Sequence, residues 1–165
     1  DGRGLKKKIG NLSMSNQIHY KRARFSTYLP TDRYYSTSHY WIKQEKDGLW
    51  KVGFTKFATR MLGEVVECDI QLRPKDEIVV GQLIGNLEAF KAVTDIYCVV
   101  KGVFEGCNSE IASNPSIISS HPYDQGWLYC ATGDPDEQSM DVQKYIELLD
   151  KTIDKLRAQE KGEDQ

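Results

Sequence analysis

The chain has 165 residues, 39% of them hydrophobic, and a formal net charge of −2 at pH 7. This length and apolar content allow one core of ordinary size and do not require a second domain. The charge lacks the positive excess typical of nucleic-acid-binding proteins, and no apolar run is long enough to span a bilayer. No secretory signal pattern is visible, so we expect a cytoplasmic protein.

Residues 1–33 form a basic N-terminal segment with few apolar residues. Its positive charges gather at positions 6–8 and 21–24. Because no hydrophobic period is sustained, we expect a mobile or loosely docked extension. A solvated tail is the favoured use of these charges, and docking to a partner or to nucleic acid is the alternative.

Residues 34–130 alternate short β-branched and aromatic runs with turn signals. Asp47 and Gly48 separate two such runs, and a turn signal at residues 73–76 precedes an apolar run at 78–80. Many short strands at this spacing predict a mainly β domain, built as a small barrel or sandwich. Residues 57–62 have a weaker helical pattern.

A mostly apolar stretch at residues 87–93 contains one lysine, Lys91. The runs at residues 79–83 and 96–104 are rich in β formers, so the stretch between them is predicted to hold a hairpin tip. Apolar side chains at such a tip would lie in water, which is unusual unless another protein contacts them. This is the pattern of a lysine made to be acylated, although on spacing alone an ordinary solvated lysine is the simpler interpretation.

Residues 131–165 are predicted to form a C-terminal helix and a polar tail. The sequence Asp-Pro-Asp-Glu at 134–137 fits a helix N-cap followed by proline at the first helical position. An apolar stripe then recurs at helical spacing through Val142, Ile146, Leu149, Ile153 and Leu156. We expect this stripe to dock on the β domain, and dimerisation or partner binding are the alternatives.

Family landmarks run in a fixed order through residues 34–128. They are His39-Tyr40-Trp41-Ile42, Val52-Gly53-Phe54-Thr55, Leu62-Gly63-Glu64-Val65-Val66, Glu88-Ala89-Phe90-Lys91-Ala92-Val93-Thr94-Asp95, Lys101-Gly102, Asn114-Pro115 and His121-Pro122-Tyr123-Asp124-Gln125-Gly126-Trp127-Leu128. This stretch resembles the H protein of the glycine cleavage system, whose lysine carries lipoic acid in a Glu-Ser-Val-Lys-Ala setting.

The resemblance implies a carrier protein that is a substrate of other enzymes and is not itself an enzyme. The implied lipoyl attachment site is Lys91, within a motif formed by Glu88, Ala89, Phe90 and Ala92. The implied fold is the barrel-sandwich hybrid of lipoyl domains, with a short internal helix and the lysine at a hairpin turn.

Lipoylation would convert the lysine into a long, uncharged, flexible arm that reaches several active sites. The five-membered dithiolane at its end holds the disulfide far from its relaxed dihedral angle, so the ring opens easily to two thiols. A lipoate ligase or lipoyl transferase is the implied modifying partner. Biotin is less favoured, because biotinyl carriers usually flank their lysine with methionine.

Departures from the family pattern bear on the cargo. Tyr40 stands where the family has a glutamate that helps hold the ammonium of the carried aminomethyl group, whereas the second carboxylate, Asp95, remains. Met61 stands where the family has a histidine. These three residues are candidate contacts of the arm or its cargo. A desolvated ammonium with one carboxylate partner is poorly compensated.

These departures favour a specialised relative, similar to the lipoate-binding proteins of the heterodisulfide-reductase-like sulfur-oxidising system. Such a protein would carry sulfur intermediates on its dithiol, with the heterodisulfide-reductase-like complex and dihydrolipoamide dehydrogenase as partners. One alternative is a true glycine cleavage carrier that serves glycine decarboxylase and aminomethyltransferase. Another is an unmodified H-like scaffold or regulator.

The four cysteines, Cys68, Cys98, Cys107 and Cys130, form no C-x-x-C pair and match no histidine spacing. We therefore expect no metal site, and buried apolar roles for the thiols. Cys98 follows the tip on the returning arm and is a candidate to meet the lipoyl sulfurs. The isolated histidines are expected to make structural hydrogen bonds.

Overall fold

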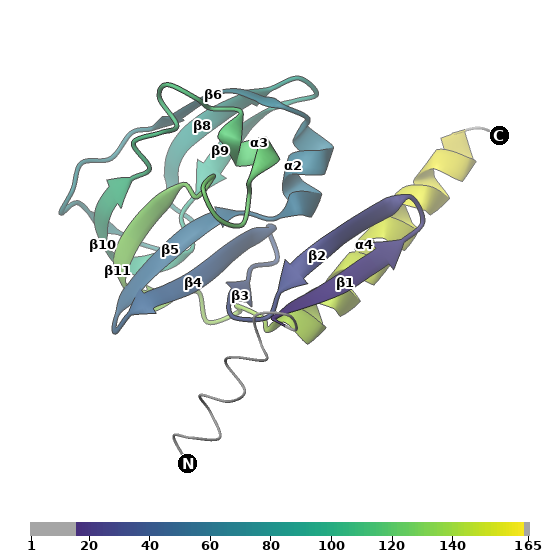
Figure 1. The fold of residues 1–165 in the computed structure, drawn as a ribbon, viewed down its shortest axis with the longest axis horizontal. Helices are drawn as coiled ribbons and strands as arrows, with labels where there is room; N and C mark the ends of the chain where they lie inside the picture. The colour runs from purple at the N-terminus through teal and green to yellow at the C-terminus, as the bar shows by residue number, and fades with distance from the viewer. Residues whose placement is uncertain (1–15, 164–165) are drawn as a thin grey trace, which may run out of the picture. The chain divides into compact units, whose positions relative to one another are not determined.

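The computed structural model describes residues 16–163. They divide into two compact units, one of residues 33–140 and one that joins residues 16–32 to 141–163 (Figure 1). No helix within the described part of the chain is long and apolar enough to cross a membrane. The basic group at residues 6–8 lies outside the described residues.

Two antiparallel sheets build the unit of residues 33–140. The first has the order β3 (Tyr34–Tyr35), β4 (Tyr40–Lys46), β5 (Leu49–Phe54), β11 (Tyr129–Pro135), β10 (Val100–Cys107) and β7 (Glu77–Ile78). The second has the order β6 (Val65–Ile70), β8 (Leu83–Ala89) and β9 (Val93–Tyr97). The short helices are α2 (Lys56–Leu62) and α3 (Ile117–Ser120). The predicted mainly β lipoyl-domain fold is confirmed.

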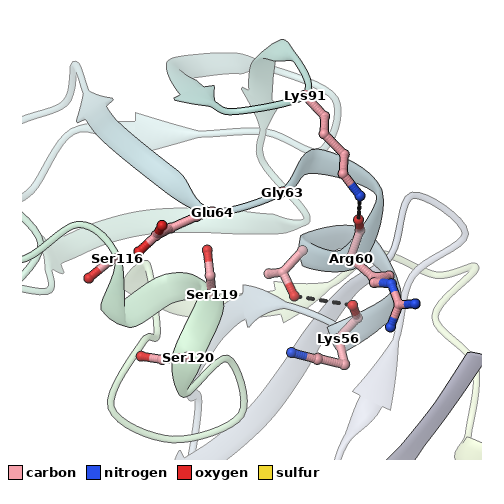
Figure 2. Close-up of a pocket in the computed structure, with 9 residues that line it drawn as sticks. Lys56, Arg60, Gly63, Glu64, Lys91, Ser116, Ser119 and Ser120 are labelled. Atoms are coloured by element: carbon pink, nitrogen blue, oxygen red, sulfur yellow. Dashed lines mark hydrogen bonds between the residues drawn. The ribbon is translucent and has the colours of Figure 1, made fainter.

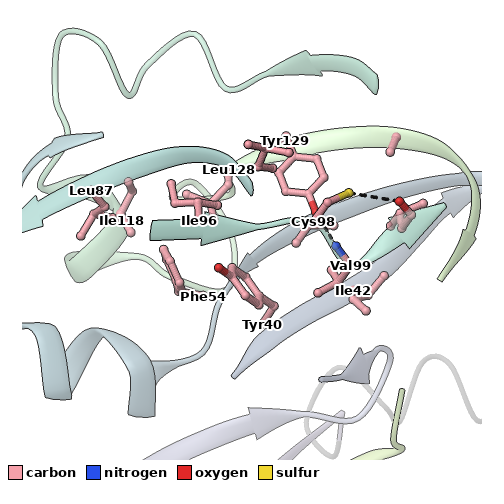
Figure 3. Close-up of a cluster of buried hydrophobic side chains, with 14 of the residues drawn as sticks. Tyr40, Ile42, Phe54, Leu87, Ile96, Cys98, Val99, Ile118, Leu128 and Tyr129 are labelled. Atoms are coloured by element: carbon pink, nitrogen blue, oxygen red, sulfur yellow. Dashed lines mark hydrogen bonds between the residues drawn. The ribbon is translucent and has the colours of Figure 1, made fainter. Parts of the chain in front are cut away.

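The core lies where side chains of the two sheets meet (Figure 3). Ile42 of β4 and Tyr129 of β11 come from the first sheet, and Leu87 of β8 and Ile96 of β9 come from the second. All four are completely buried. In β4 and β5 the core residues are every second residue, Tyr40 and Ile42 on β4 and Val52 and Phe54 on β5, as strand alternation requires.

The hairpin with Lys91 at its tip is present, but its arms differ from the prediction. They are β8 and β9 themselves, whereas residues 79–82 form a turn in which Gln82 N–H donates to Val79 O (3.2 Å). Gly81 adopts φ +87°, which glycine tolerates without strain. The first residues of the apolar run at 79–83 therefore lie in an exposed turn. The strand was predicted there because valine is common in strands.

The expectation of a mobile N-terminal extension is wrong for residues 17–30. They form an antiparallel hairpin of β1 (Gln17–Arg22) and β2 (Phe25–Pro30). Phe25, Thr27 and Leu29 alternate inward and are buried, and Tyr20 joins them from β1. Two strands of six residues are too short for this period to stand out against the basic residues around them.

Helix α4 (Val142–Glu163) shares a unit with this hairpin. Its buried side chains are Val142, Tyr145, Leu149 and Ile153, while Ile146 and Leu156 of the predicted stripe are half-buried. The Tyr20 hydroxyl donates to Asp150 Oδ1 (2.8 Å), and Arg22 pairs with Asp154. The hairpin of β1 and β2 therefore packs against α4. The sequence had predicted the β domain as the partner of the apolar stripe and had not predicted this hairpin.

The predicted helix start at Asp134 is also wrong. Asp134 and Pro135 end β11, paired with Lys101 and Val100 of β10. The cap is Asp141, whose Oδ1 accepts the Lys144 N–H (2.9 Å). The cap pattern at 134–137 does not start a helix, because the backbone of Asp134 and Pro135 is already paired with β10.

Candidate functional site

Lys91 lies in a three-residue loop between β8 and β9, and its side chain is exposed. Three backbone hydrogen bonds hold the loop: Ala89 N–H to Ala92 O (2.9 Å), Phe90 N–H to Glu64 O (3.0 Å) and Lys91 N–H to Leu62 O (2.9 Å). The Lys91 Nζ donates to Arg60 O at 3.3 Å (Figure 2). A fixed backbone therefore presents a solvent-accessible amine at the end of α2.

Gly63 allows the tip to approach the end of α2. Its φ is +81°, and its N–H donates to Thr59 O (2.9 Å) to terminate the helix. A Cβ at this position would lie 3.1 Å from Lys91 Cγ and 3.3 Å from Lys91 N. Glycine is favoured here by the backbone angle, and a side chain at this position would also press against Lys91.

Two apolar residues near Lys91 are exposed on the hairpin. Phe90 and Val93 are 75% and 76% exposed, so the tip does place apolar side chains in water. Glu88 is exposed opposite Val93 on β8, while Ala89 is buried. An enzyme that approaches Lys91 therefore meets an apolar surface with one carboxylate beside it.

Lys91 borders a cavity of about 350 Å³, which we call the acceptor cavity (Figure 2). Its lining residues come from α2, from the segment after it, from the tip and from the α3 region. They are Lys56, Thr59, Arg60, Gly63, Glu64, Lys91, Ser116, Ser119 and Ser120. Three of these residues carry cationic side chains and one carries a carboxylate, although most of the exposed lining surface is contributed by apolar atoms.

A second cavity of about 320 Å³, which we call the aromatic cavity, brings together Tyr40, Met61 and Asp95. Three of the four predicted cargo contacts thus share one site, although up to 55 positions separate them in sequence (95 − 40). Its walls are rings and short side chains: Ser38, His39, Phe54, Phe57, Ala58, Leu62, Thr94 and Tyr97.

Helix α2 contributes one face to each cavity. Lys56, Thr59 and Arg60, three and four positions apart, line the acceptor cavity, and Phe57, Met61 and their neighbours line the aromatic cavity. Thr55 caps the helix by accepting the Ala58 N–H (3.3 Å). The Lys56 N–H donates to the Tyr123 hydroxyl (3.0 Å), so the landmark at 121–128 positions the start of α2.

The ionisable groups deep in the aromatic cavity are neutral at pH 7. Burial lowers the pKa of His39 to about 4 and raises the pKa of Tyr40 to about 12. The Tyr40 hydroxyl accepts the Tyr97 N–H (3.1 Å), and the Tyr97 hydroxyl donates to Asp95 Oδ2 (3.3 Å). Asp95, which is exposed, is the one carboxylate among the lining residues.

Cys98 is excluded as a contact of the arm. It is 1% exposed in the core, its thiol donates to Val100 O (3.1 Å), and the Tyr129 hydroxyl donates to its sulfur (3.8 Å) (Figure 3). Burial raises the pKa of this thiol, which disfavours the reactive thiolate. The strand returning from the tip turns this side chain inward, which position along the chain did not reveal.

Three further residues of the cavities escaped the sequence prediction. His39 was expected to be structural, but it lines the aromatic cavity with φ +69° and its ring 4.7 Å from that of Phe57. Lys56 and Arg60 belong to no recognisable motif. Only their spacing of four positions, which places both on one helix face, could have indicated that they lie together. Within residues 16–163, no cluster of histidine, cysteine and carboxylate side chains suits a metal ion.

Comparison with known proteins gives consistent results. The family model described as "Glycine cleavage H-protein" matches residues 33–152. A glycine cleavage system H protein of Kocuria rhizophila is 34% identical over 128 residues, covering 75% of this chain and 99% of that protein. The glycine cleavage system H protein 4 of Aquifex aeolicus is 33% identical over 132 residues, 78% of this chain and 76% of that protein.

The same relationship appears in three dimensions. The crystal structure of a glycine cleavage system H protein from Mycobacterium marinum superposes with a TM-score of 0.65 and 27% identity. The match covers 71% of this chain and 95% of that one. The hairpin of β1 and β2 lies before the matched family residues.

Proposed function

Because the chain belongs to the glycine cleavage H-protein family, whose members are lipoyl carriers and not enzymes, we propose that it carries lipoic acid on Lys91 as a swinging arm. The observation that carries this proposal is the rigid tip. Its backbone is tied to Leu62 and Glu64 while its amine stays exposed, and Phe90 and Val93 offer an enzyme something to contact.

The cargo we propose first is the aminomethyl group of glycine cleavage. The relatives are named for that system, and H proteins work with glycine decarboxylase, aminomethyltransferase, dihydrolipoamide dehydrogenase and a lipoate ligase. Asp95 at the aromatic cavity supplies one carboxylate for the ammonium of such a cargo. The arm would bring its loaded end to this cavity.

A second candidate cargo is a sulfur intermediate, and Tyr40 is the observation that favours it. Its neutral phenol occupies the place of the second carboxylate, so an ammonium in the aromatic cavity has one charged partner, which is exposed. An uncharged or anionic sulfur cargo needs no such pair. A heterodisulfide-reductase-like complex would then replace glycine decarboxylase as the partner.

The carrier proposal is tested by the intact mass of the protein purified from a host that attaches lipoate. We expect the added mass of one lipoyl group, located on Lys91 by peptide mass spectrometry. Lys91→Arg keeps the charge but cannot form the amide, so it should remain unmodified and equally stable. If Lys91 stays unmodified in such hosts and with purified lipoate ligases, the chain is an H-like scaffold instead.

A further inference from the structure

Two peptide groups between α2 and β6 hold the hairpin tip, and the first of them is oriented by α2. It joins Leu62 to Gly63, and its C=O accepts the Lys91 N–H (2.9 Å). A trans peptide group is a rigid plane whose N–H and C=O point in opposite directions, so a bond to the N–H also sets the direction of the C=O. Here the Gly63 N–H donates to Thr59 O (2.9 Å). The helix backbone thus orients this group without the help of a side chain.

The second peptide group depends on a side chain. It joins Glu64 to Val65, and its C=O accepts the Phe90 N–H (3.0 Å). Its N–H donates to the Ser119 hydroxyl oxygen at 2.8 Å. Because β6 lies at the edge of its sheet, an N–H on its outer side has no strand to pair with, and the serine provides the acceptor. One planar group therefore connects the Ser119 hydroxyl to the residue next to Lys91.

Ser119 occupies a firmly anchored position. Its helix α3 contributes Ile117 and Ile118, and both side chains are buried. The same helix packs against α2 and against β6. In Figure 2 the Ser119 hydroxyl points toward the segment at Glu64, whereas the Ser120 side chain points to another side. The hydroxyl is thus held at a fixed place relative to the strand start that it contacts.

We propose that Ser119 is a positioning residue for the acylation of Lys91. The inference rests on the proposed function, because it concerns the reaction that modifies this lysine. Ser119 holds the peptide group between Glu64 and Val65, and that group holds the tip backbone at Phe90. Hydrogen bonds in such a chain also strengthen one another. An enzyme that acylates the amine then meets the tip in one arrangement, and a displacement of about 1 Å can slow a reaction strongly.

Removal of the hydroxyl has a local consequence. The Val65 N–H loses its acceptor, so its peptide group is free to rotate and the bond to the Phe90 N–H weakens. The bond from the Lys91 N–H to Leu62 O keeps its orientation, because α2 sets it. The Phe90 N–H should therefore respond to a change at Ser119 much more than the Lys91 N–H does.

The test is Ser119→Ala in the full chain, with Ser119→Thr as the variant that keeps the hydroxyl. Hydrogen exchange followed by NMR should show the Phe90 N–H exchanging about fivefold faster in Ser119→Ala, the size expected for one lost hydrogen bond between neutral groups. The Cys98 N–H, which donates to Gln82 O (2.8 Å) at the far end of the hairpin, should exchange at its wild-type rate. Ser119→Thr should restore the wild-type rate at Phe90.

Acylation provides the second readout. With a purified lipoate ligase that modifies the wild type, kcat/KM should fall about fivefold for Ser119→Ala and recover for Ser119→Thr. Acetylation of Lys91 by the N-hydroxysuccinimide ester of acetic acid should be equally fast in all variants, because the lysine is exposed and no enzyme has to recognise the tip. Ser113→Ala removes an exposed hydroxyl that donates to Glu110 O (3.3 Å) and is the matched control. Thermal unfolding verifies that each variant is folded.

Unchanged exchange at Phe90, or an unchanged kcat/KM of Ser119→Ala, would overturn the inference. So would faster exchange of the Cys98 N–H by the same factor, because the serine would then stabilise the whole domain and not the tip. Failure of the carrier proposal is recognised separately, since the wild type itself would then remain unmodified by every ligase, whatever the exchange rates of the variants.

Discussion

The two cavities beside α2 differ sharply in charge. The acceptor cavity has three cations and one carboxylate, whereas the aromatic cavity has neutral rings, a neutral histidine and the exposed Asp95. A helix of seven residues separates them, because side chains three and four positions apart share one face. The comparison teaches that one short helix can separate two chemically different environments, because its opposite faces carry different side chains.

The tip lies at the junction of the two environments. The Lys91 N–H donates to Leu62 O, Leu62 lines the aromatic cavity, and the Lys91 side chain lines the acceptor cavity. The backbone of Lys91 is therefore fixed next to both cavities. This arrangement follows from the bond to the helix end and from the missing side chain at Gly63.

The largest expected effect is a pH dependence of stability that arises from His39 in the aromatic cavity. The folded-state pKa of His39, about 4, lies below its value near 6.5 in an unfolded chain, so the unfolded state takes up the proton first. Stability is fully present above pH 6.5 and should fall by about 2.5 kcal/mol between pH 7 and pH 4.5. Urea unfolding at the two pH values measures this loss.

His39→Asn is the matched variant, because asparagine tolerates the positive φ of this position. It should lose less stability than the wild type over the same range. Glu105 and Asp154, whose pKa values are lowered by Lys75 and Arg22 respectively, also lose stabilisation in acid, but they do so in both proteins. An identical pH dependence of the two proteins would refute the assignment to His39.

The next effect concerns the missing carboxylate. Tyr40→Glu adds a second acidic group to the aromatic cavity and should raise glycine-dependent aminomethyl loading of the lipoylated protein about tenfold, the value of one charge-assisted hydrogen bond. Loading is measured by the exchange of labelled bicarbonate with glycine by glycine decarboxylase. Tyr40→Phe, which lacks the hydroxyl but adds no charge, should bring no gain. Efficient loading of the unaltered protein would exclude the sulfur candidate.

A smaller effect is expected where the tip meets α2. Gly63→Ala strains the backbone at φ +81° and crowds Lys91, so it should cost about 1 kcal/mol of stability and slow lipoylation. Gly81→Ala has nearly the same φ but no atom within 4 Å of the added methyl group. It should cost similar stability and leave the lipoylation rate unchanged. Equal lipoylation rates for the two variants would contradict a role of Gly63 in holding the tip.

The smallest effect on stability is expected outside both cavities. Phe90→Ser removes an apolar side chain that is 75% exposed, so the free energy of unfolding should change by less than about 0.5 kcal/mol. The KM of a lipoate ligase for the protein should rise, because the enzyme loses an apolar contact. Val80→Ser, exposed in the turn away from the tip, is the control. An unchanged KM would show that Phe90 is not part of the contact surface.

Prediction from sequence succeeded where local pattern or ordered landmarks carried the information. The mainly β fold, the exposed tip and the apolar stripe of α4 follow from short-range periodicity. It failed at Asp134, where a cap pattern lies within a strand, and at residues 17–30, where basic residues masked two short amphipathic strands. In both cases the local sequence pattern was misleading because the segment pairs with another strand, β10 for Asp134 and β1 with β2 for residues 17–30.

The sequence by itself determined the family, which lysine is the candidate acceptor and which residues depart from the family pattern, because these are identities at positions along a recognisable order. Only the tertiary structure decided that Tyr40, Met61 and Asp95 share one cavity, that Cys98 is sealed in the core, and that Lys56 and Arg60 lie beside Lys91. The physical reason is that burial and proximity depend on how β8, β9 and α2 pack together. Residues distant in the chain become neighbours only when those elements are assembled.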